Sequence, residues 1–299
     1  MAFFPKVKIV ILGFIMATAL LPRTVIFAQP VTVIRVAIED NIYSLNIRIR
    51  GGYTIRDSKT NAVYYEGTDI NATATTYPDG IIIGGIRCPA EKIRIEAKQL
   101  FGLSVNGRMF RDTIVLVRHP KGGLLVINSV NLEDYVKGIL YHEVSHYWPP
   151  EILKAQAIVC RTYAVYQARE RAGKDFDVTS DVLSQVYGGL TSERYRTNRA
   201  VEETRGKVLT YRGKILPAFF HASCGGSTED ASLLWNTSLP PLQGVRCDYC
   251  KDSPHYSWHA VLSMKEIEEK FADAGLPLKK IQNIAESGRD ASGRVTDLM

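Results

Sequence analysis

Glu143 stands at a position where a helix would bury an apolar residue. Apolar residues recur at helical spacing from Leu132 onward, and Glu143 falls four residues after Ile139, on the apolar stripe. A carboxyl removed from water has a raised pKa, and such a carboxyl can act as a general acid near neutral pH. The periodicity alone also permits a glutamate that is simply hydrogen-bonded at the edge of the core.

His142 and His146 flank this glutamate in the zinc-binding spacing H-E-x-x-H. Two histidines four residues apart on one helix can bind one metal ion, with a third ligand from elsewhere. Pro149 and Pro150 would break such a helix soon afterwards. A zinc metalloprotease is therefore a minor alternative to two histidines that flank a groove without a metal ion.

Longer blocks of sequence surround and follow Glu143. They comprise residues 131–164, which read Asn-Leu-Glu-Asp-Tyr-Val-Lys-Gly at their start, then residues 184–189 and 223–228, followed by Trp235. Together these blocks resemble the stage II sporulation protein D / LytB amidase-enhancer family (the SpoIID/LytB domain). The resemblance covers about residues 31–299.

This resemblance implies a lytic transglycosylase, which cleaves the bond between N-acetylmuramic acid and N-acetylglucosamine in peptidoglycan. Most glycosidases use two carboxylates, but here one can suffice, because the C6 hydroxyl of the sugar itself attacks the anomeric carbon. Glu143 would be both the acid and the base, and catalysis would require no cofactor. Related family members are described as enhancers of a cell-wall amidase, so a non-catalytic peptidoglycan-binding enhancer is the alternative.

The resemblance also implies a set of substrate-binding residues. Arg161 would pair with a lactyl or acetamido oxygen or hold Glu143 in place, and Lys154 lies two helical turns before it on the same face. Glycines in the third block would let the backbone approach the glycan closely. The expected set is Lys154, Gln156, Arg161, Tyr163, Ser184, Gln185, Tyr187, Ser223, Gly225 and Gly226.

The five cysteines cannot all pair within one chain, because their number is odd. Cys160 falls inside a helical pattern and is expected in the core. The zinc site that some family members form from Cys and His just before the second block has no counterpart here, since residues 177–183 contain neither type.

A different site is possible at Cys224, Cys247 and Cys250, of which the last two form a C-x-x-C. With His221 or His255 they would make a closed tetrahedral zinc site, structural rather than catalytic. A disulfide among the three cysteines is the competing interpretation, because export favours oxidation.

The first 28 residues have the features of an export signal. Lys6 and Lys8 precede an apolar run that is short for a membrane-spanning helix, and Ala28 ends a plausible cleavage site. A cleaved signal peptide, or an N-terminal anchor, would place the protein in the cell envelope outside the cytoplasmic membrane. With Arg23, this segment holds half of the net charge of +6. The remaining excess suits an anionic cell wall, but no basic patch indicates a nucleic-acid partner.

The pattern of elements predicts an α+β fold. We expect a signal or anchor at 1–28, a β-rich part at 29–130, and a catalytic part at 131–299 whose last strand stops short at the end of the chain. The second part should contain strands near 33–38, 45–49, 81–83, 92–96, 114–117 and 124–127. The third part should contain two central helices, from Leu132, with Asn131 as its N-cap, to Pro149 and from Pro150 to about Arg171. A helix near 193–204, a hairpin near 207–220 and a loop-rich region should follow, and then a helix that begins with a capping box of Ser263 and Glu266.

Overall fold

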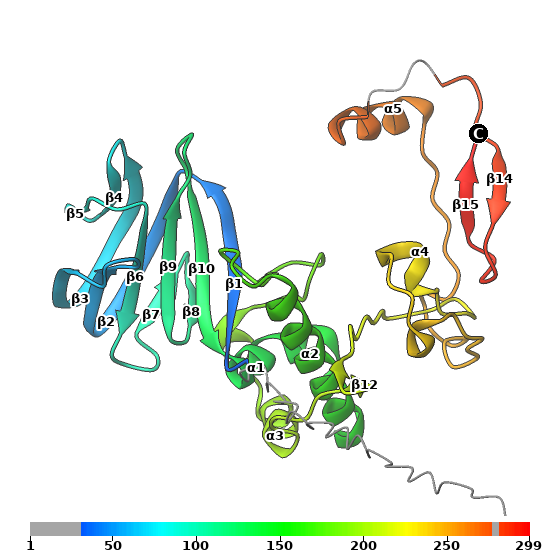
Figure 1. Ribbon diagram of the computed structural model, residues 1–299, viewed down its shortest axis with the longest axis horizontal. Coiled ribbons are helices and arrows are strands. Elements are labelled where there is room, and N and C mark those ends of the chain that lie inside the picture. Colours follow the sequence, from blue (N-terminus) through cyan, green and yellow to red (C-terminus); the bar gives the residue numbers. More distant parts are fainter. Residues whose placement is uncertain (1–30, 277–280) are drawn as a thin grey trace, which may run out of the picture. The chain divides into compact units, whose positions relative to one another are not determined.

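The computed structural model describes residues 31–276 and 281–299 (Figure 1). The predicted signal or anchor at 1–28 lies outside the described residues. Residues Val31–Met299 form one compact unit. None of the helices within the two described ranges combines the length and the hydropathy that crossing a membrane requires. The architecture is α+β and rich in strands, as the sequence predicts.

A large, mostly antiparallel sheet fills the first part of this unit (Figure 1). Its main path runs in the order β11-β1-β10-β9-β6-β2-β3-β4-β5, with β7 paired to β2 and β8 paired to β7. The strands are β1 (Val33–Ile42), β2 (Ser44–Asp57), β3 (Val63–Tyr77), β4 (Gly80–Ile83), β5 (Ile86–Cys88), β6 (Lys92–Ala97), β7 (Leu103–Val105), β8 (Arg108–Phe110), β9 (Thr113–Arg118), β10 (Leu124–Asn131) and β11 (Val178–Thr179).

Apolar content, continuous or alternating, explains which strands the sequence reveals. In β2, Leu45, Ile47 and Ile49 are buried and the residues between them are exposed, the pattern of a strand with one wet face. β3 has only one fully buried residue, Ala74, and so shows no apolar period. Accordingly β1, β2, β4, β6, β9 and β10 are confirmed, whereas β3, β5, β7 and β8 were not predicted.

Two helices follow the sheet. The chain passes directly from β10 into α1 (Leu132–Glu143), and α2 (Pro150–Glu170) follows (Figure 1). The side chain of Asn131 accepts a hydrogen bond from the N–H of Glu133 at 2.9 Å, which confirms the predicted N-cap. α1 ends earlier than predicted, because Val144 is extended and the N–H of Trp148 donates to the carbonyl of Ser145 in a turn. Glu143 therefore lies at the end of the helix.

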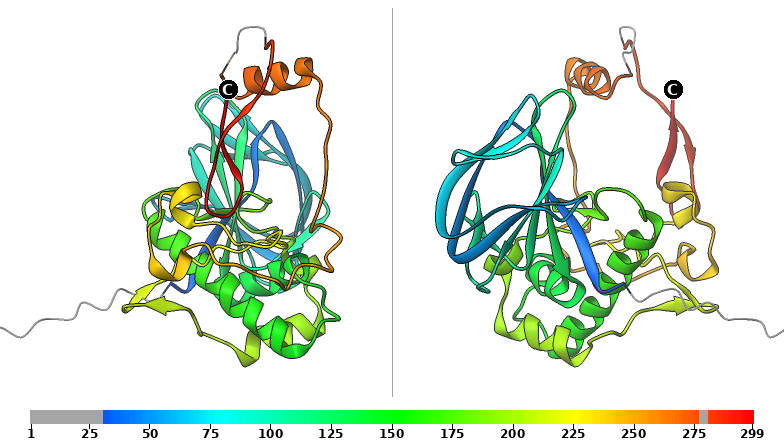
Figure 2. Two further views of the ribbon diagram at one scale, coloured as in Figure 1. Left: turned by 90° about the vertical axis from the view of Figure 1, so that its right-hand side faces the viewer. Right: turned by 60° about the vertical axis from the view of Figure 1, so that its left-hand side comes forward.

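One hydrophobic core joins the sheet to these helices. It contains Ile34 and Val130 from the strands, Ile139 from α1, and Ala157 and Cys160 from α2. The predicted core position of Cys160 is confirmed. Figure 2 shows the sheet and the helices from two further sides. Because the core is shared, the β-rich part and the two-helix part stabilise each other.

The remaining elements carry little core. They are the 3₁₀ helices η1 (Gly189–Ser192) and η2 (Pro240–Leu242), the helices α3 (Tyr195–Glu203), α4 (Ala231–Trp235) and α5 (Met264–Asp273), and the pairs β12 (Thr210–Tyr211) with β13 (Lys214–Ile215) and β14 (Glu286–Arg289) with β15 (Val295–Leu298). The capping box of Ser263 and Glu266 is confirmed. Within 222–276 only Cys224 and Ala231 are buried. The predicted loop-rich character is thus correct, although α4 was not predicted.

Candidate active site

Glu143 lines a cavity of about 690 Å³ beside the C-terminal end of α1. α1 and the following turn, α2, the 182–186 loop, the 219–222 segment and α4 all contribute to its wall. The lining residues are His142, Glu143, Val144, Trp148, Gln156, Tyr163, Gln167, Val182, Leu183, Ser184, Gln185, Val186, Phe219, Phe220, His221, Ala222 and Trp235.

Burial raises the pKa of the Glu143 carboxyl above its ordinary value. The amide N–H of Val186 donates to Oε1 of Glu143 at 3.3 Å and opposes this rise, because it stabilises the charged form. The direction agrees with the expectation from the apolar stripe. A carboxyl in this setting can hold a proton nearer to neutral pH than an exposed glutamate can.

The cavity contains a single carboxyl group and many aromatic rings. Of its lining residues, all within the described part of the chain, Glu143 is the only acidic one. The rings of Phe219 and Trp235 stack at 4.2 Å between centroids with an interplanar angle of 15°, and Tyr163 meets Phe219 edge-on at 6.4 Å. Aromatic faces flanking one acid suit a ligand with flat apolar surfaces, such as a sugar ring.

The 184–189 segment reaches Glu143 because α1 has a glycine where the two meet. A Cβ at Gly138 would lie 2.4 Å from Cε2 of Tyr187, and the N–H of Gly188 donates to the carbonyl of Gly138 at 3.2 Å. The Tyr187 hydroxyl donates to Oδ1 of Asn128 in β10 at 2.6 Å. These contacts anchor the segment whose Val186 N–H faces the carboxylate.

Gln185 also lines this cavity, although its side chain is buried. Its Oε1 accepts a hydrogen bond from the Tyr135 hydroxyl at 2.9 Å. Its buried Nε2 has no hydrogen-bond partner among the described residues. An unpaired buried donor of this kind costs free energy.

Part of the chain that forms this cavity is similar to known proteins. Residues 120–211, which include Glu143 and Val186, match the family model described as Stage II sporulation protein. An uncharacterized protein of Brachyspira hyodysenteriae is 32% identical over 89% of this chain and 72% of its own length. The chain belongs to the SpoIID/LytB family.

Two further relatives carry names from this family. The amidase enhancer of Bacillus subtilis is 35% identical over 48% of this chain, and stage II sporulation protein D of Bacillus amyloliquefaciens is 31% identical over 57% of it. The aligned regions are 19% and 51% of those two proteins. The chain therefore spans about half or less of the named relatives.

The structure brings part of the expected SpoIID/LytB site together. Gln156, Tyr163, Ser184 and Gln185 line the cavity with Glu143. Tyr187 is buried outside the lining and anchors the segment through its hydrogen bond to Asn128. Ser223, Gly225 and Gly226 lie outside the lining but directly follow its 219–222 wall.

Arg161 requires a correction. It is fully buried, its Nε and Nη2 donate to both carboxylate oxygens of Glu133 in α1, and Nη1 donates to the carbonyl of Lys207 at 3.1 Å. With its donors engaged inside the core, it can neither reach a glycan nor hold Glu143. Its role is to join α1, α2 and the segment after α3.

Lys154 also lies away from the cavity. It pairs with Glu203 of α3 at 2.7 Å and with Glu151 at 2.9 Å, beside a separate, smaller hollow between α2 and α3. The shared helix face with Arg161 is real, but that face is turned toward α3. The prediction that Lys154 lines the Glu143 groove is therefore wrong for this structure.

The H-E-x-x-H pattern does not form a metal site. α1 ends at Glu143, so His146 is not on the helix that would align it with His142. Nε2 of His142 lies 2.6 Å from the Ser192 hydroxyl, whereas His146 packs on Tyr147 with 4.0 Å between ring centroids. Among residues 31–276 and 281–299, the metal-ligand grouping comprises cysteines alone.

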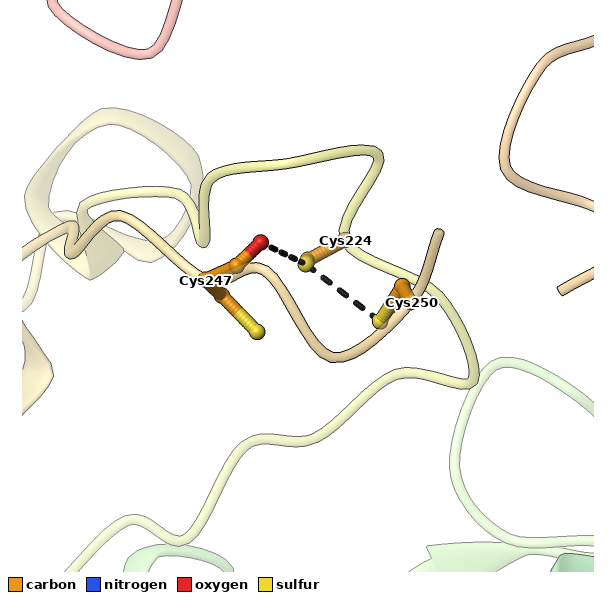
Figure 3. Close-up of side chains that lie close together, drawn as sticks. All are labelled: Cys224, Cys247 and Cys250. Atoms are coloured by element: carbon orange, nitrogen blue, oxygen red, sulfur yellow. Dashed lines mark hydrogen bonds between the residues drawn. The ribbon is translucent and has the colours of Figure 1, made fainter. Parts of the chain in front are cut away.

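That grouping consists of Cys224, Cys247 and Cys250, whose sulfur atoms all lie within 4.8 Å of one another (Figure 3). The two histidines expected as a fourth ligand are not part of it. His221 lines the Glu143 cavity instead, and no ligand atom of His255 joins the three sulfurs.

Other contributors were not predicted from the sequence. The Val186 N–H is a backbone group, and no side-chain pattern reveals it. Phe219 and Phe220 were predicted as part of a hairpin strand, but β13 ends at Ile215 and leaves them to form the wall. Two adjacent aromatic residues shortly before the 223–228 block were the available signal.

Proposed function

We propose that this protein is a lytic transglycosylase that cleaves peptidoglycan glycan strands, with Glu143 as general acid and then general base. The observation that carries the proposal is the solitary, partly buried carboxyl of Glu143 in a cavity with aromatic walls. A glycosidase that activates water ordinarily needs a second carboxylate across the bond. A reaction in which the sugar supplies its own nucleophile needs only one.

The reaction requires Glu143 to start protonated. Its proton passes to the glycosidic oxygen as the bond to the anomeric carbon breaks. The C6 hydroxyl of the muramic acid attacks that carbon, and the Glu143 carboxylate then accepts the hydroxyl proton. The products are a 1,6-anhydro-muramic end and a free hydroxyl on the leaving sugar, and the carboxyl regains its proton for the next cycle.

The other cavity residues would bind the strand. Trp235, Phe219 and Tyr163 offer ring faces for pyranose rings, and Gln156 and Ser184 offer polar groups for the acetamido carbonyls. The Val186 N–H limits the rise in pKa, and it would stabilise the carboxylate that forms after proton transfer. We expect the protein to act in the cell envelope after export, on the wall itself.

The test is digestion of purified peptidoglycan, intact and stripped of stem peptides, by the full chain and by Glu143→Gln. Mass spectrometry should find 1,6-anhydro-muramic ends with the wild type and a loss of roughly 10²–10⁴-fold with Glu143→Gln. Glu66→Gln is a matched control, since Glu66 is an exposed partner of Lys98 in the sheet. Equal digestion by Glu143→Gln would refute the catalytic role.

The second candidate is a peptidoglycan-binding protein that stimulates a cell-wall amidase. It is favoured by the 35% identity to a relative named amidase enhancer. The same aromatic cavity would bind the strand without cutting it. Stimulation of an added amidase that persists in Glu143→Gln, without anhydro ends from either protein, would establish this function in place of the first.

A further inference from the structure

Three cysteines from two distant segments meet in the loop-rich region (Figure 3). Cys224 follows the wall of the Glu143 cavity, and Cys247 and Cys250 lie after α4. The Sγ atoms of Cys224 and Cys250 are 3.5 Å apart, and all three sulfurs lie within 4.8 Å of one another. Thiolates at about 2.3 Å from a tetrahedral zinc ion are separated by about 3.8 Å, so the spacing suits a shared metal ion.

The backbone fixes this arrangement. The N–H of Cys247 donates to the carbonyl of Gly226 at 2.9 Å, and Ser227 pairs with Arg246 in an antiparallel bridge. Gly225 and Gly226 have φ of +63° and +109°, values that favour glycine, and they turn the chain directly after Cys224. Two chain segments whose backbones are hydrogen-bonded to each other thus hold the three sulfur atoms in place.

An arginine near the C-terminal end of the described residues also holds the loop that carries Cys224. Nη2 of Arg294, in the turn before β15, donates to the carbonyl of Cys224 at 2.9 Å and to that of Ser227 at 3.0 Å. The Arg294 side chain also pairs with Glu229 at 3.3 Å. The loop that carries Cys224 is therefore held on both sides without any contribution from a large apolar core.

Sparse burial explains why a cross-link would be needed here. Between 222 and 276 the fully buried residues are Cys224 and Ala231, too few to order some fifty residues by apolar burial alone. A disulfide would join two of the three sulfurs and leave the third as a free thiol. A metal ion uses all three, and soft thiolate ligands suit zinc.

We propose that Cys224, Cys247 and Cys250 bind one zinc ion as three thiolates. Each thiol loses its proton on binding, and the fourth position is open to a ligand from outside the group, such as water. The ion would fix the 219–222 wall of the Glu143 cavity, since that wall ends two residues before Cys224. The metal site itself stands independently of the proposed glycan cleavage.

The first measurement is the metal content of the full chain, purified without chelators. Elemental analysis should find about one zinc ion per chain. Cys224→Ser, Cys247→Ser and Cys250→Ser should each lose most of it, whereas Cys88→Ser should keep it, because Cys88 is buried in β5 away from the cluster. Equal zinc content in all four variants would overturn the assignment.

A second measurement uses the wild type alone, so it stays informative if the cysteine variants fail to fold. Zinc is removed from the wild type by a chelator and replaced with Co²⁺, which should give thiolate charge-transfer absorption and the intense visible bands of a tetrahedral site. Intact mass after alkylation under native conditions should show the three thiols protected until the metal is removed. A mass lower by two hydrogens with no metal bound would establish a disulfide and refute the proposal, as would metal-free protein with every thiol reduced.

Discussion

Arg161 of α2 and Glu133 of α1 form a bidentate ion pair in the core, with 3.0 Å from Nε to Oε1 and 2.8 Å from Nη2 to Oε2. The same carboxylate accepts a hydrogen bond from the N–H of Gly206 at 3.0 Å, and the guanidinium donates to the Val201 carbonyl at 3.2 Å. One buried pair thus joins α1, α2 and the end of α3. It fixes the first turn of the helix whose last residue is Glu143.

Removing this guanidinium should destabilise the fold strongly. In Arg161→Met the Glu133 carboxylate stays buried without its partner, a situation that costs about 3–5 kcal/mol. Chemical denaturation followed by circular dichroism should show the lower midpoint. Lys154→Met is the matched control on the same helix, since its ion pairs are solvent-accessible, and it should shift the midpoint far less. Similar midpoints for the two variants would contradict the structural role of Arg161.

Glu143→Gln should change stability in a pH-dependent way. Burial raises the pKa of Glu143 in the folded state above its ordinary value of 4.5. Below pH 4.5 the carboxyl is mostly protonated in both the folded and the unfolded state. As the pH rises through the folded pKa, the unfolded state loses the proton first, so the wild type loses stability relative to Glu143→Gln.

Thermal unfolding of both proteins between pH 4 and pH 8 tests this expectation. The midpoint of Glu143→Gln minus that of the wild type should increase with pH. A constant difference would show that the pKa of Glu143 is the same in the folded and unfolded states. Glu66→Gln, at an exposed site, provides the comparison for a carboxyl without burial.

The pH dependence of glycan cleavage should follow the same carboxyl. In the proposed reaction Glu143 donates a proton to the glycosidic oxygen, so kcat/KM should fall as the pH rises through its raised pKa. Burial and the charge of Arg194 lower the pKa of His142, which disfavours the charged, proton-donating form of this neighbour. Release of anhydro ends across this pH range measures the profile, and His142→Gln should keep the alkaline limb in place.

Gly138→Ala should disturb the site through packing. The added methyl would lie 2.4 Å from the Tyr187 ring and 3.3 Å from the carbonyl of Gly189. Overpacking of this kind costs about 1–3 kcal/mol, and it should push the Val186 N–H away from Glu143. We expect a lower unfolding midpoint and slower cleavage. If the effects of Gly138→Ala and Tyr187→Ala simply add in the double variant, the Gly138–Tyr187 contact is not the cause.

Local patterns were enough for most of the elements. Apolar runs, with alternation in β2, revealed six strands of the sheet, helical periodicity revealed α1 and α2, and Asn131 and Ser263 marked helix starts by capping. Strands without an apolar period, such as β3, were missed because their burial depends on neighbours that the local sequence does not specify. The end of α1 was misplaced, because the extended Val144 precedes the two prolines that seemed to decide it.

The sequence by itself determined that Glu143 is a carboxyl on an apolar face, because that follows from spacing within one helix. Only the tertiary structure decided which groups surround it. Arg161 is paired with a residue 28 positions away, and Cys224 meets Cys250 across 26 positions. Spacing within an element fixes the face on which a side chain lies, but its partner depends on how separate elements pack, and no local pattern contains that information.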